Sequence, residues 1–255
     1  HVIDYLCELS QSVGRKLMVR LVKGAYWDSE IKHSQQLGVA HYPVFTRKSS
    51  TDVSYHACAN KLLAHRDTIF PQFATHNAYT ASVIIEASGG CKDDFEFQCL
   101  HGMGDSLYDQ VVTEEKIQCR VYAPVGQHED LLAYLVRRLL ENGANSSFVN
   151  AIVDPDLPVE SLLIDPVERT TRLAQIANTQ IPLPTEMFQD RKNSKGLDIF
   201  DQQIIEPLVE KINQFVSTHL PLDLSQKPYQ LDDRLVIYNP ARPNDVVAVL
   251  PKDNQ

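Results

Sequence analysis

Two cationic side chains, Arg20 and Lys23, end an apolar run in the stretch Arg-Leu-Val-Lys-Gly-Ala-Tyr-Trp-Asp at residues 20–28. An apolar run that stops at a glycine is typical of a buried strand. The carboxyl end of such a strand is where α/β folds hold their active sites. A cation there is costly unless an anion meets it. The pair therefore indicates either an anionic ligand or local carboxylates that act as counter-charges.

A second cationic pair, Arg137 and Arg138, falls in a helix predicted over about residues 128–142. Tyr134 and Glu141 share their face, because residues three and four apart are neighbours on a helix. The opposite face is apolar and is expected to be buried; it carries Leu132, Leu135, Val136, Leu139 and Leu140. If the polar face is solvated, Glu141 pairs with the arginines. If it leans over a strand-end site, the two guanidiniums could clamp a carboxylate.

Two further clusters follow predicted strands, Thr75-His76-Asn77 and the stretch from Gln98 to Gly104. Hydroxyls, amides and glycines at strand-to-helix turns suit a cofactor with phosphates and a polar ring system. The alternative is structural, with Asn77 as a helix cap and the glycines in a tight turn. No histidine or cysteine spacing points to a catalytic metal, and no Gly-x-Ser-x-Gly elbow supports a serine hydrolase.

The elements that must position these residues alternate between strand and helix. Strands are predicted at 16–24, 69–74, 95–100 and 119–123, and helices at about 2–9, 29–37, 50–63, around 83–85 and 128–142. This alternation implies parallel strands, right-handed crossovers and outer helices. The predicted fold is of the α/β class: the C-terminal half of a (β/α)8 TIM-type barrel, with four βα units in residues 1–150. A free half-barrel would expose two strand edges, so we expect the missing units to precede His1 in a longer protein.

The pattern changes after residue 150. A mostly helical linker is expected at 151–228, with a helix at 166–178 and another that begins or kinks at Pro207. Two apolar runs at 234–238 and 246–250, joined by a long turn at 239–245, predict a β-hairpin that opens a further domain at 229–255.

Composition excludes several classes of protein. A net charge of −9 and the absence of a long basic run argue against nucleic-acid binding by this segment. Five scattered cysteines suit a reducing compartment. No apolar run approaches the roughly 20 residues of a membrane span.

These segments together resemble the proline dehydrogenase barrel of the bifunctional proline utilisation A family. The matching segments are Leu17–Glu30, Val44–Lys48, Pro71–Asn77, Phe95–Gly104 and Arg120–Phe148. Two of the motifs are long and specific, Leu-Val-Lys-Gly-Ala-Tyr-Trp-Asp and Tyr-Leu-Val-Arg-Arg-Leu-Leu-Glu-Asn-Gly-Ala-Asn. The remainder resembles the linker of the same family, and the terminal hairpin resembles the opening of its aldehyde dehydrogenase-type domain.

The resemblance implies FAD-dependent oxidation of L-proline to pyrroline-5-carboxylate, with hydride transfer to flavin N5. This would be the first step of proline catabolism to glutamate. Arg20 would lie near the flavin N5 atom, and Tyr26 and Tyr122 would form walls of the proline pocket. Arg137 and Arg138 would hold the substrate carboxylate, and Glu141 would position the helix that carries them. The residues implied to line the cofactor are Arg20, Val22, Gly24, Ala25, Trp27, Thr46, Lys48, Thr75, His76, Asn77, Gln98, Cys99 and Ser147.

The family also supplies parts that this segment lacks: early barrel strands with a lysine and an aspartate of the pocket, and an NAD-dependent glutamate-semialdehyde dehydrogenase site. The isolated segment is therefore expected to be inactive. The resemblance further implies a quinone acceptor at the membrane and a cytoplasmic enzyme that could lie at the periphery of the inner membrane, and it leaves a homo-oligomer open. Two alternatives stay open, another flavin- or phosphate-binding TIM-barrel enzyme and a segment with only a structural role.

Overall fold

The computed structural model describes residues 1–24, 26–143, 158, 163–219, 222–223 and 234–251. The chain divides into two compact units, which are described separately. The first unit comprises residues 1–34 and 41–183, and the second comprises residues 35–40 and 184–255.

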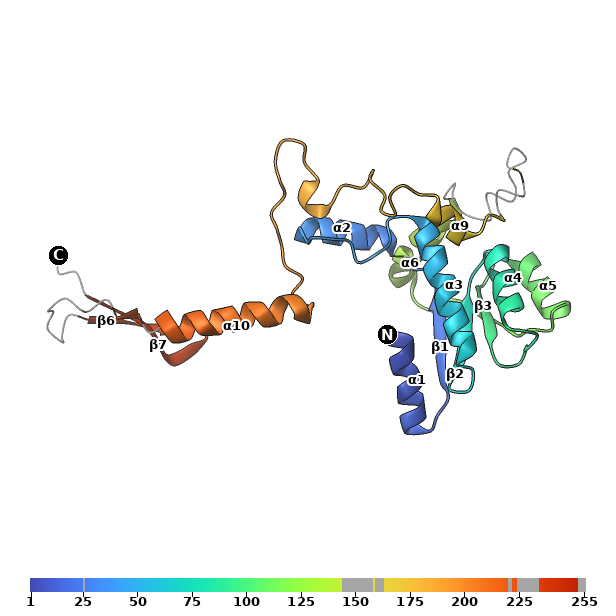
Figure 1. Ribbon diagram of the computed structural model, residues 1–255, viewed down its shortest axis with the longest axis horizontal. Coiled ribbons are helices and arrows are strands. Elements are labelled where there is room, and N and C mark those ends of the chain that lie inside the picture. The colour runs from blue at the N-terminus through green and yellow to red at the C-terminus, as the bar shows by residue number, and fades with distance from the viewer. Residues whose placement is uncertain (25, 144–157, 159–162, 220–221, 224–233, 252–255) are drawn as a thin grey trace. The chain divides into compact units, whose positions relative to one another are not determined.

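The first unit is built on a four-stranded parallel sheet (Figure 1). Its strands are β1 (Leu17–Val22), β2 (Ile69–Ala74), β3 (Glu96–Leu100) and β4 (Cys119–Tyr122), and they lie side by side in chain order. Each strand lies within the range predicted for it to within one or two residues, and every pairing is parallel. The carboxyl ends of all four strands therefore meet at one edge, as the α/β prediction requires.

One face of the sheet carries the core. Strand residues at odd positions, such as Ile69, Phe73 and Phe97, pack against helices α1 (Val2–Val13), α3 (Lys48–Ala64), α4 (Ala78–Ala87) and α5 (Asp105–Thr113). Phe95 and Phe97 are fully buried, and their ring centres lie 5.7 Å apart in an edge-to-face arrangement, which is the favoured geometry for aromatic pairs. This apolar layer fixes the strands and leaves their even positions facing the other way.

The helices of this unit differ from the prediction in several boundaries and in one additional helix; α1 ends four residues later than expected, and α2 (Trp27–Leu37) begins two residues earlier. Helix α3 begins at Lys48 and follows Arg47, whose side chain makes no capping bond, so Ser50 and Thr51 lie inside the first turn. Helix α5 was not predicted; its Gly104 N-cap adopts φ 71°, a conformation that glycine reaches at no steric cost. Helix α4 is capped by the Asn77 side chain, which accepts a bond from the Thr80 amide at 3.1 Å.

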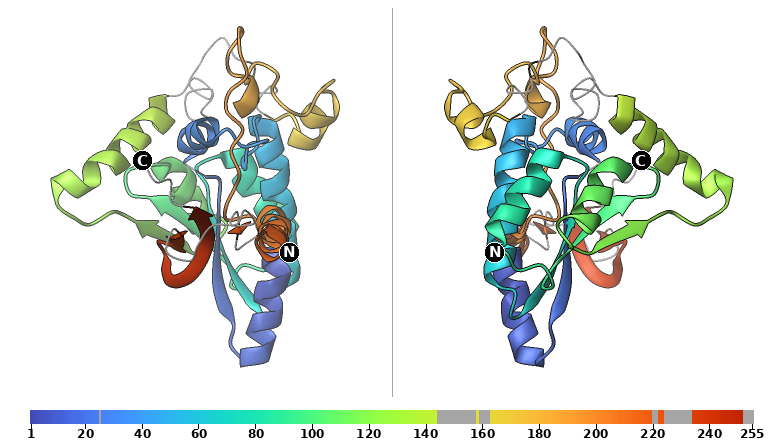
Figure 2. Two further views of the ribbon diagram at one scale, coloured as in Figure 1. Left: turned by 90° about the vertical axis from the view of Figure 1, so that its left-hand side faces the viewer. Right: turned by 90° about the vertical axis from the view of Figure 1, so that its right-hand side faces the viewer.

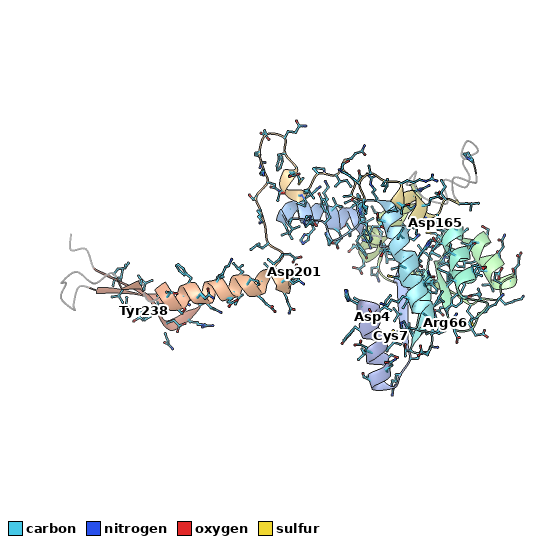
Figure 3. All side chains as sticks on the ribbon, viewed as in Figure 1. Asp4, Cys7, Arg66, Asp165, Asp201 and Tyr238 are labelled. Carbon is cyan, nitrogen blue, oxygen red and sulfur yellow. The ribbon has the colours of Figure 1, made fainter. Side chains whose placement is uncertain are left out.

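Residues 163–183 belong to the first unit. They include helix α9 (Pro166–Thr171), which packs against α3. Asp165 (Figure 3) caps it by accepting a bond from the Val167 amide at 2.8 Å. The helix is shorter than the predicted range of 166–178: it ends at Thr171, and turns and bends follow it.

The second unit contains a 3-10 turn (Pro184–Glu186), helix α10 (Gln202–His219), and a sheet of β5 (Leu222–Asp223), β7 (Arg242–Pro251) and β6 (Arg234–Asn239). Helix α10 begins five residues before Pro207 and continues through it. The antiparallel β6–β7 hairpin confirms two predicted strands. The long turn was wrong, because Asn239 pairs with Arg242 and only Pro240 and Ala241 form the turn. Among the described helices, none combines the length and the apolar content of a membrane span.

Candidate active site

The even positions of the sheet form a polar network on the face away from α3, α4 and α5. Arg20, Gln72, Glu96, Gln98 and Arg120 lie there on four neighbouring strands. Glu96 accepts bonds from Gln72 Nε2 at 2.6 Å and from Gln98 Nε2 at 3.0 Å. Arg120 donates two bonds to its carboxylate, at 2.7 and 2.9 Å. These bonds satisfy both oxygens of a carboxylate that would otherwise be costly to bury.

Arg20 joins this network at its edge. Its Nε donates to Gln98 Oε1 at 2.9 Å, and its guanidinium carbon lies 4.9 Å from the centre of the Tyr122 ring. Among the described residues, no carboxylate lies within salt-bridge distance of Arg20. Its positive charge is therefore held in place by a neutral amide and an aromatic ring, and it stays available to an anionic or electron-accepting ligand.

Lys23 shows the contrasting case. Its Nζ lies 2.5 Å from Asp52 Oδ1 and donates to Thr80 Oγ1 at 3.1 Å. The interpretation that local carboxylates balance the strand-end cations is therefore confirmed for Lys23, and it does not extend to Arg20.

The polar cluster after β2, Thr75-His76-Asn77, makes hydrogen bonds that stabilise its own turn and the neighbouring strand end. The Asn77 amide donates to Thr75 Oγ1 at 3.1 Å, and the Tyr108 hydroxyl donates to the Thr75 carbonyl. His76 Nε2 accepts a bond from the Leu100 amide at 3.1 Å, so it ties the end of β2 to the end of β3. All three predicted residues thus have structural contacts at the carboxyl edge of the sheet.

The cluster after β3 divides between the two faces. The Gln98 side chain lies in the polar network, whereas Cys99 is buried in the apolar core with its Sγ 3.6 Å from that of Cys119. Burial raises the pKa of the Cys119 thiol to about 12, with Cys99 adding to the rise. Only the backbone of Cys99 could therefore contribute to a site on the polar face.

Helix α6 (His128–Gly143) carries three polar residues that are partly buried. The Arg137 guanidinium lies over the Tyr26 ring, 4.6 Å from its centre, and Nη2 donates to the Tyr26 hydroxyl at 3.3 Å. Arg138 lies 5.3 Å from the centre of the Tyr134 ring, and all three α6 residues are half-buried. The helix stands apart from α3 and α4 (Figure 2).

The apolar side of α6 was expected to be buried, and that prediction was wrong for its described residues. The exposed fractions are 57% for Leu132, 46% for Leu135 and 45% for Val136. The physical reason is that no other described element covers this side. Arg137 and Arg138 are partly buried, whereas the side chain of Glu141, their expected partner on a solvated face, lies outside the described residues.

Two further predicted residues, Thr46 and Lys48, line a cavity of about 320 Å³. Its lining consists of Thr46, Arg47, Lys48, Ser49, Arg169, Leu173 and Asn178. Thr46 Oγ1 accepts a bond from the Asn178 amide at 2.8 Å, which joins the start of α3 to the segment after α9. Desolvation lowers the pKa of Lys48; Asp52 opposes this effect, and Lys23 and Arg169 add to it. Three cations around one cavity suit a ligand that carries phosphates.

The other predicted residues lie between these groups or outside the described residues. Val22 and Gly24 are exposed at the end of β1, and the Trp27 indole donates to the Phe45 carbonyl at 2.8 Å. Ala25, Ser147 and the side chain of Glu141 lie outside the described residues.

Sequence reasoning missed Gln72, Glu96 and Arg120. The available signal was their parity: they occupy even positions on strands whose odd positions are apolar, and side chains two apart on a strand share a face. Arg47 and Arg169 were also missed, because they approach the cavity from segments far apart in the chain.

A flavin dinucleotide fits this arrangement of donors. Arg20 offers a positive charge and Gln98 an amide on the polar face, and three cations surround the separate cavity. Arg47 Nε is buried there without a hydrogen-bond partner among the described residues. A flavin ring gains negative charge on reduction, so a fixed cation beside it stabilises the reduced form without reorganisation. No group of three metal-ligating side chains occurs within the part of the chain that the structure describes.

Comparisons with known proteins agree with this arrangement. The family model described as proline dehydrogenase matches residues 1–151. The chain is 49% identical over 261 residues to the bifunctional protein PutA of Escherichia coli K12, a match that covers 96% of this chain and 20% of that protein. The chain therefore spans about a fifth of the length of this relative.

Solved structures that are similar to this chain also carry the name proline utilization A. Proline utilization A from Bradyrhizobium japonicum superposes with a TM-score of 0.77 at 52% identity, over 84% of this chain and 22% of that one. The protein of the same name from Bdellovibrio bacteriovorus superposes with a TM-score of 0.78 at 30% identity, over 97% of this chain and 26% of that one. This likeness agrees with the α/β fold and the parallel sheet described above.

Proposed function

Because the chain belongs to the proline dehydrogenase family, we propose that it forms the C-terminal half of a (β/α)8 barrel that oxidises L-proline to pyrroline-5-carboxylate. When bound, FAD supplies the acceptor for the hydride that leaves the substrate ring. The protein's task is then to hold the substrate, to stabilise the charge that develops and to exclude water.

Arg20 provides the fixed charge in this proposal. It would lie beside the flavin N5 edge, where its guanidinium would favour the reduced, more negative cofactor. The bond to Gln98 and the contact with the Tyr122 ring hold it in place before the reaction. No reorganisation is then needed at the moment of hydride transfer.

Arg137 and Arg138 hold the substrate carboxylate. Proline is small, and its carboxylate is the group that gives a protein the firmest grip, so paired guanidinium donors orient the whole molecule. Tyr26 and Tyr122 pack against the apolar ring and exclude water. Glu141 positions the helix that carries the two arginines.

The cofactor-binding residues fall into two groups in this proposal. The first group would hold the ring and its attached chain, and it consists of Arg20, Val22, Gly24, Ala25, Trp27, Thr75, His76, Asn77, Gln98, Cys99 and Ser147. Thr46 and Lys48, together with Arg47 from the same cavity, meet the phosphates. Cys99 acts through its backbone, since its side chain lies in the core.

The parent protein supplies the rest of the reaction. We propose that residues 1–150 complete a barrel with strands that precede this segment, that residues 151–228 form a linker, and that the hairpin in residues 229–255 opens an aldehyde dehydrogenase-type domain. That domain would use NAD to oxidise glutamate semialdehyde. Electrons would leave the flavin to a quinone, with the cytoplasmic enzyme at the periphery of the inner membrane, and the parent could form a homo-oligomer.

One observation carries this proposal: the half-buried position of Arg137 and Arg138, although the apolar side of their helix is exposed. An amphipathic helix ordinarily buries its apolar stripe. An anion bound between this helix and the sheet would account for arginines that are less exposed than Leu132 and Leu135 of the same helix.

Substitution of these arginines in the full-length parent tests the proposal. Arg137→Met and Arg138→Met should each raise the KM for proline about 10- to 100-fold, because a hydrogen bond to a charged group contributes about 1.5–3 kcal/mol. The matched control is Arg172→Met, which removes an exposed arginine that pairs with Glu168. A KM unchanged from wild type in both variants, with the flavin bound, would overturn the proposed role.

A further inference from the structure

Glu96 is a buried carboxylate that the proposed chemistry does not use. The residue is 2% exposed, although it lies on the polar face of β3 and not in the apolar core. Burial of a carboxylate is costly unless its oxygens are fully bonded. Four donor atoms, from Gln72, Gln98 and Arg120, meet the two oxygens. A fully bonded, buried carboxylate at the first residue of β3 raises the question of what it does beyond packing.

The bond from Gln98 to Glu96 indicates what this role is, because it fixes the orientation of the Gln98 side-chain amide. A glutamine amide has one acceptor end and one donor end. Gln98 Nε2 donates to Glu96, so Oε1 must point the other way, and there it accepts the bond from Arg20 Nε. If the amide turned over, it would present its NH2 group to the guanidinium and lose both bonds. Glu96 therefore determines which end of Gln98 faces Arg20.

Arg120 completes the arrangement. Its two bonds to Glu96 neutralise the carboxylate from β4, while its own side chain remains 58% exposed. Without this partner, Glu96 would carry a buried negative charge close to Arg20 and would draw that cation into an ion pair. With it, Arg20 is held by a neutral amide and keeps its charge available.

We propose that Glu96 is a positioning residue that acts through Gln98 to hold the Arg20 guanidinium in its reactive orientation. This inference rests on the proposed function, in which Arg20 stabilises the reduced flavin. It predicts that the loss of Glu96 weakens the influence of Arg20, although the substitution removes a negative charge.

The direction of the change in sulfite affinity distinguishes a positioning role of Glu96 from a purely electrostatic one. Sulfite adds to flavin N5, and a cation close to N5 favours the adduct. If Glu96 acted only through its field, its replacement by a neutral residue would tighten sulfite binding. If Glu96 positions Arg20, the same replacement weakens it.

The experiment uses the full-length parent with its flavin bound and measures the sulfite dissociation constant by the loss of visible absorbance. Glu96→Met should weaken sulfite binding by about tenfold or more, the effect of losing a hydrogen bond to a charged group, and should lower kcat with little change in the KM for proline. Glu96→Gln keeps an acceptor for Gln98 and should restore both quantities to within a few-fold of wild type. Glu115→Gln is the matched control, since Glu115 pairs with Lys92 away from the sheet, and it should match wild type.

A double variant tests the route through Arg20. If the route is correct, Glu96→Met should add no more than about a two-fold effect on sulfite binding in an Arg20→Met background, because residues that act through one another are not additive. Tighter sulfite binding in Glu96→Met, or full additivity in the double variant, would overturn the inference.

Gln98→Met covers the case in which Glu96→Met does not fold. This change alters no charge, so a field effect predicts unchanged sulfite binding, and the positioning role predicts the same weakening, again absent in the Arg20→Met background. Unchanged binding would overturn the inference. Failure of the proposed function looks different, because the wild-type parent would then lack flavin or would not be reduced by proline.

Discussion

Arg137 and Tyr26 join two parts of the chain that are 111 residues apart, through a hydrogen bond of 3.3 Å and a guanidinium 4.6 Å from the ring centre. One residue follows β1 and the other lies in the middle of α6. The contact brings the end of the sheet and the arginine side of the helix to the same place. The substrate site that we propose lies beside this contact.

The hydroxyl of Tyr26 should contribute to this pocket through Arg137. We expect Tyr26→Phe to keep the ring contact and lose the hydrogen bond, and so to raise the KM for proline by about 3- to 10-fold, since such a bond contributes about 0.5–1.5 kcal/mol. Steady-state kinetics of the full-length parent measure this effect. Tyr42→Phe, which removes a hydroxyl bonded to the Pro182 carbonyl, is the control and should leave KM unchanged. An equal KM for both variants would contradict the role of the Tyr26 hydroxyl.

The Lys23–Asp52 pair should matter for stability and not for substrate binding. The exposed fractions of the two side chains are 23% and 19%, and Asp52→Asn leaves the ammonium largely buried without its anion. We expect a loss of about 1–3 kcal/mol in the free energy of unfolding, with the KM for proline unchanged. Urea denaturation, followed by the fluorescence of released flavin, measures the loss.

The exposed Arg172–Glu168 pair supplies the control for that measurement. Glu168→Gln should cost less than about 1 kcal/mol, because solvent screens an exposed pair. A cost for Asp52→Asn no larger than that of the control would show that Lys23 does not depend on its counter-charge.

The Glu96 network should make the parallel sheet sensitive to acid. The hydrogen bonds from Arg120, and then those from Gln98 and Gln72, lower the pKa of Glu96 below its usual 4.5, against the opposing effect of burial. The ionised carboxylate therefore contributes stability that is fully present above pH 4.5 and is lost as the pH falls through the lowered pKa. We expect the melting temperature of wild type to fall more steeply below pH 4.5 than that of Glu96→Gln. Parallel pH curves for the two proteins, with Glu115→Gln as the control, would contradict this linkage.

The sheet was predictable because its signals are local. An apolar run that stops at polar residues or glycine marks a strand, and β1 to β4 each carry that signal. The hairpin turn was less predictable. Pairing with β6 extends β7 back to Arg242 through polar residues, so tertiary contacts override the weak strand preference of Asn244 and Asp245.

The site was predictable only in part, because some of its features are local in the sequence and others depend on tertiary contacts. The strand-end position of Arg20 and the face shared by Arg137 and Arg138 follow from periodicity. The direction of that face does not, because it depends on what covers α6, and Leu132 is exposed where the pattern predicted burial. The polar face of β3 could have been read from the parity of Glu96 and Gln98, but the bonds of Glu96 to Gln72 and Arg120 join different strands, and no spacing within one strand reveals them.

The most direct test of the central claim is the visible absorption spectrum of the purified full-length parent, before and after addition of L-proline in the absence of an electron acceptor. The account predicts a bound-flavin spectrum that bleaches with proline and not with other small amino acids. A flavin spectrum that proline leaves unchanged, or a protein that binds no flavin, would contradict it.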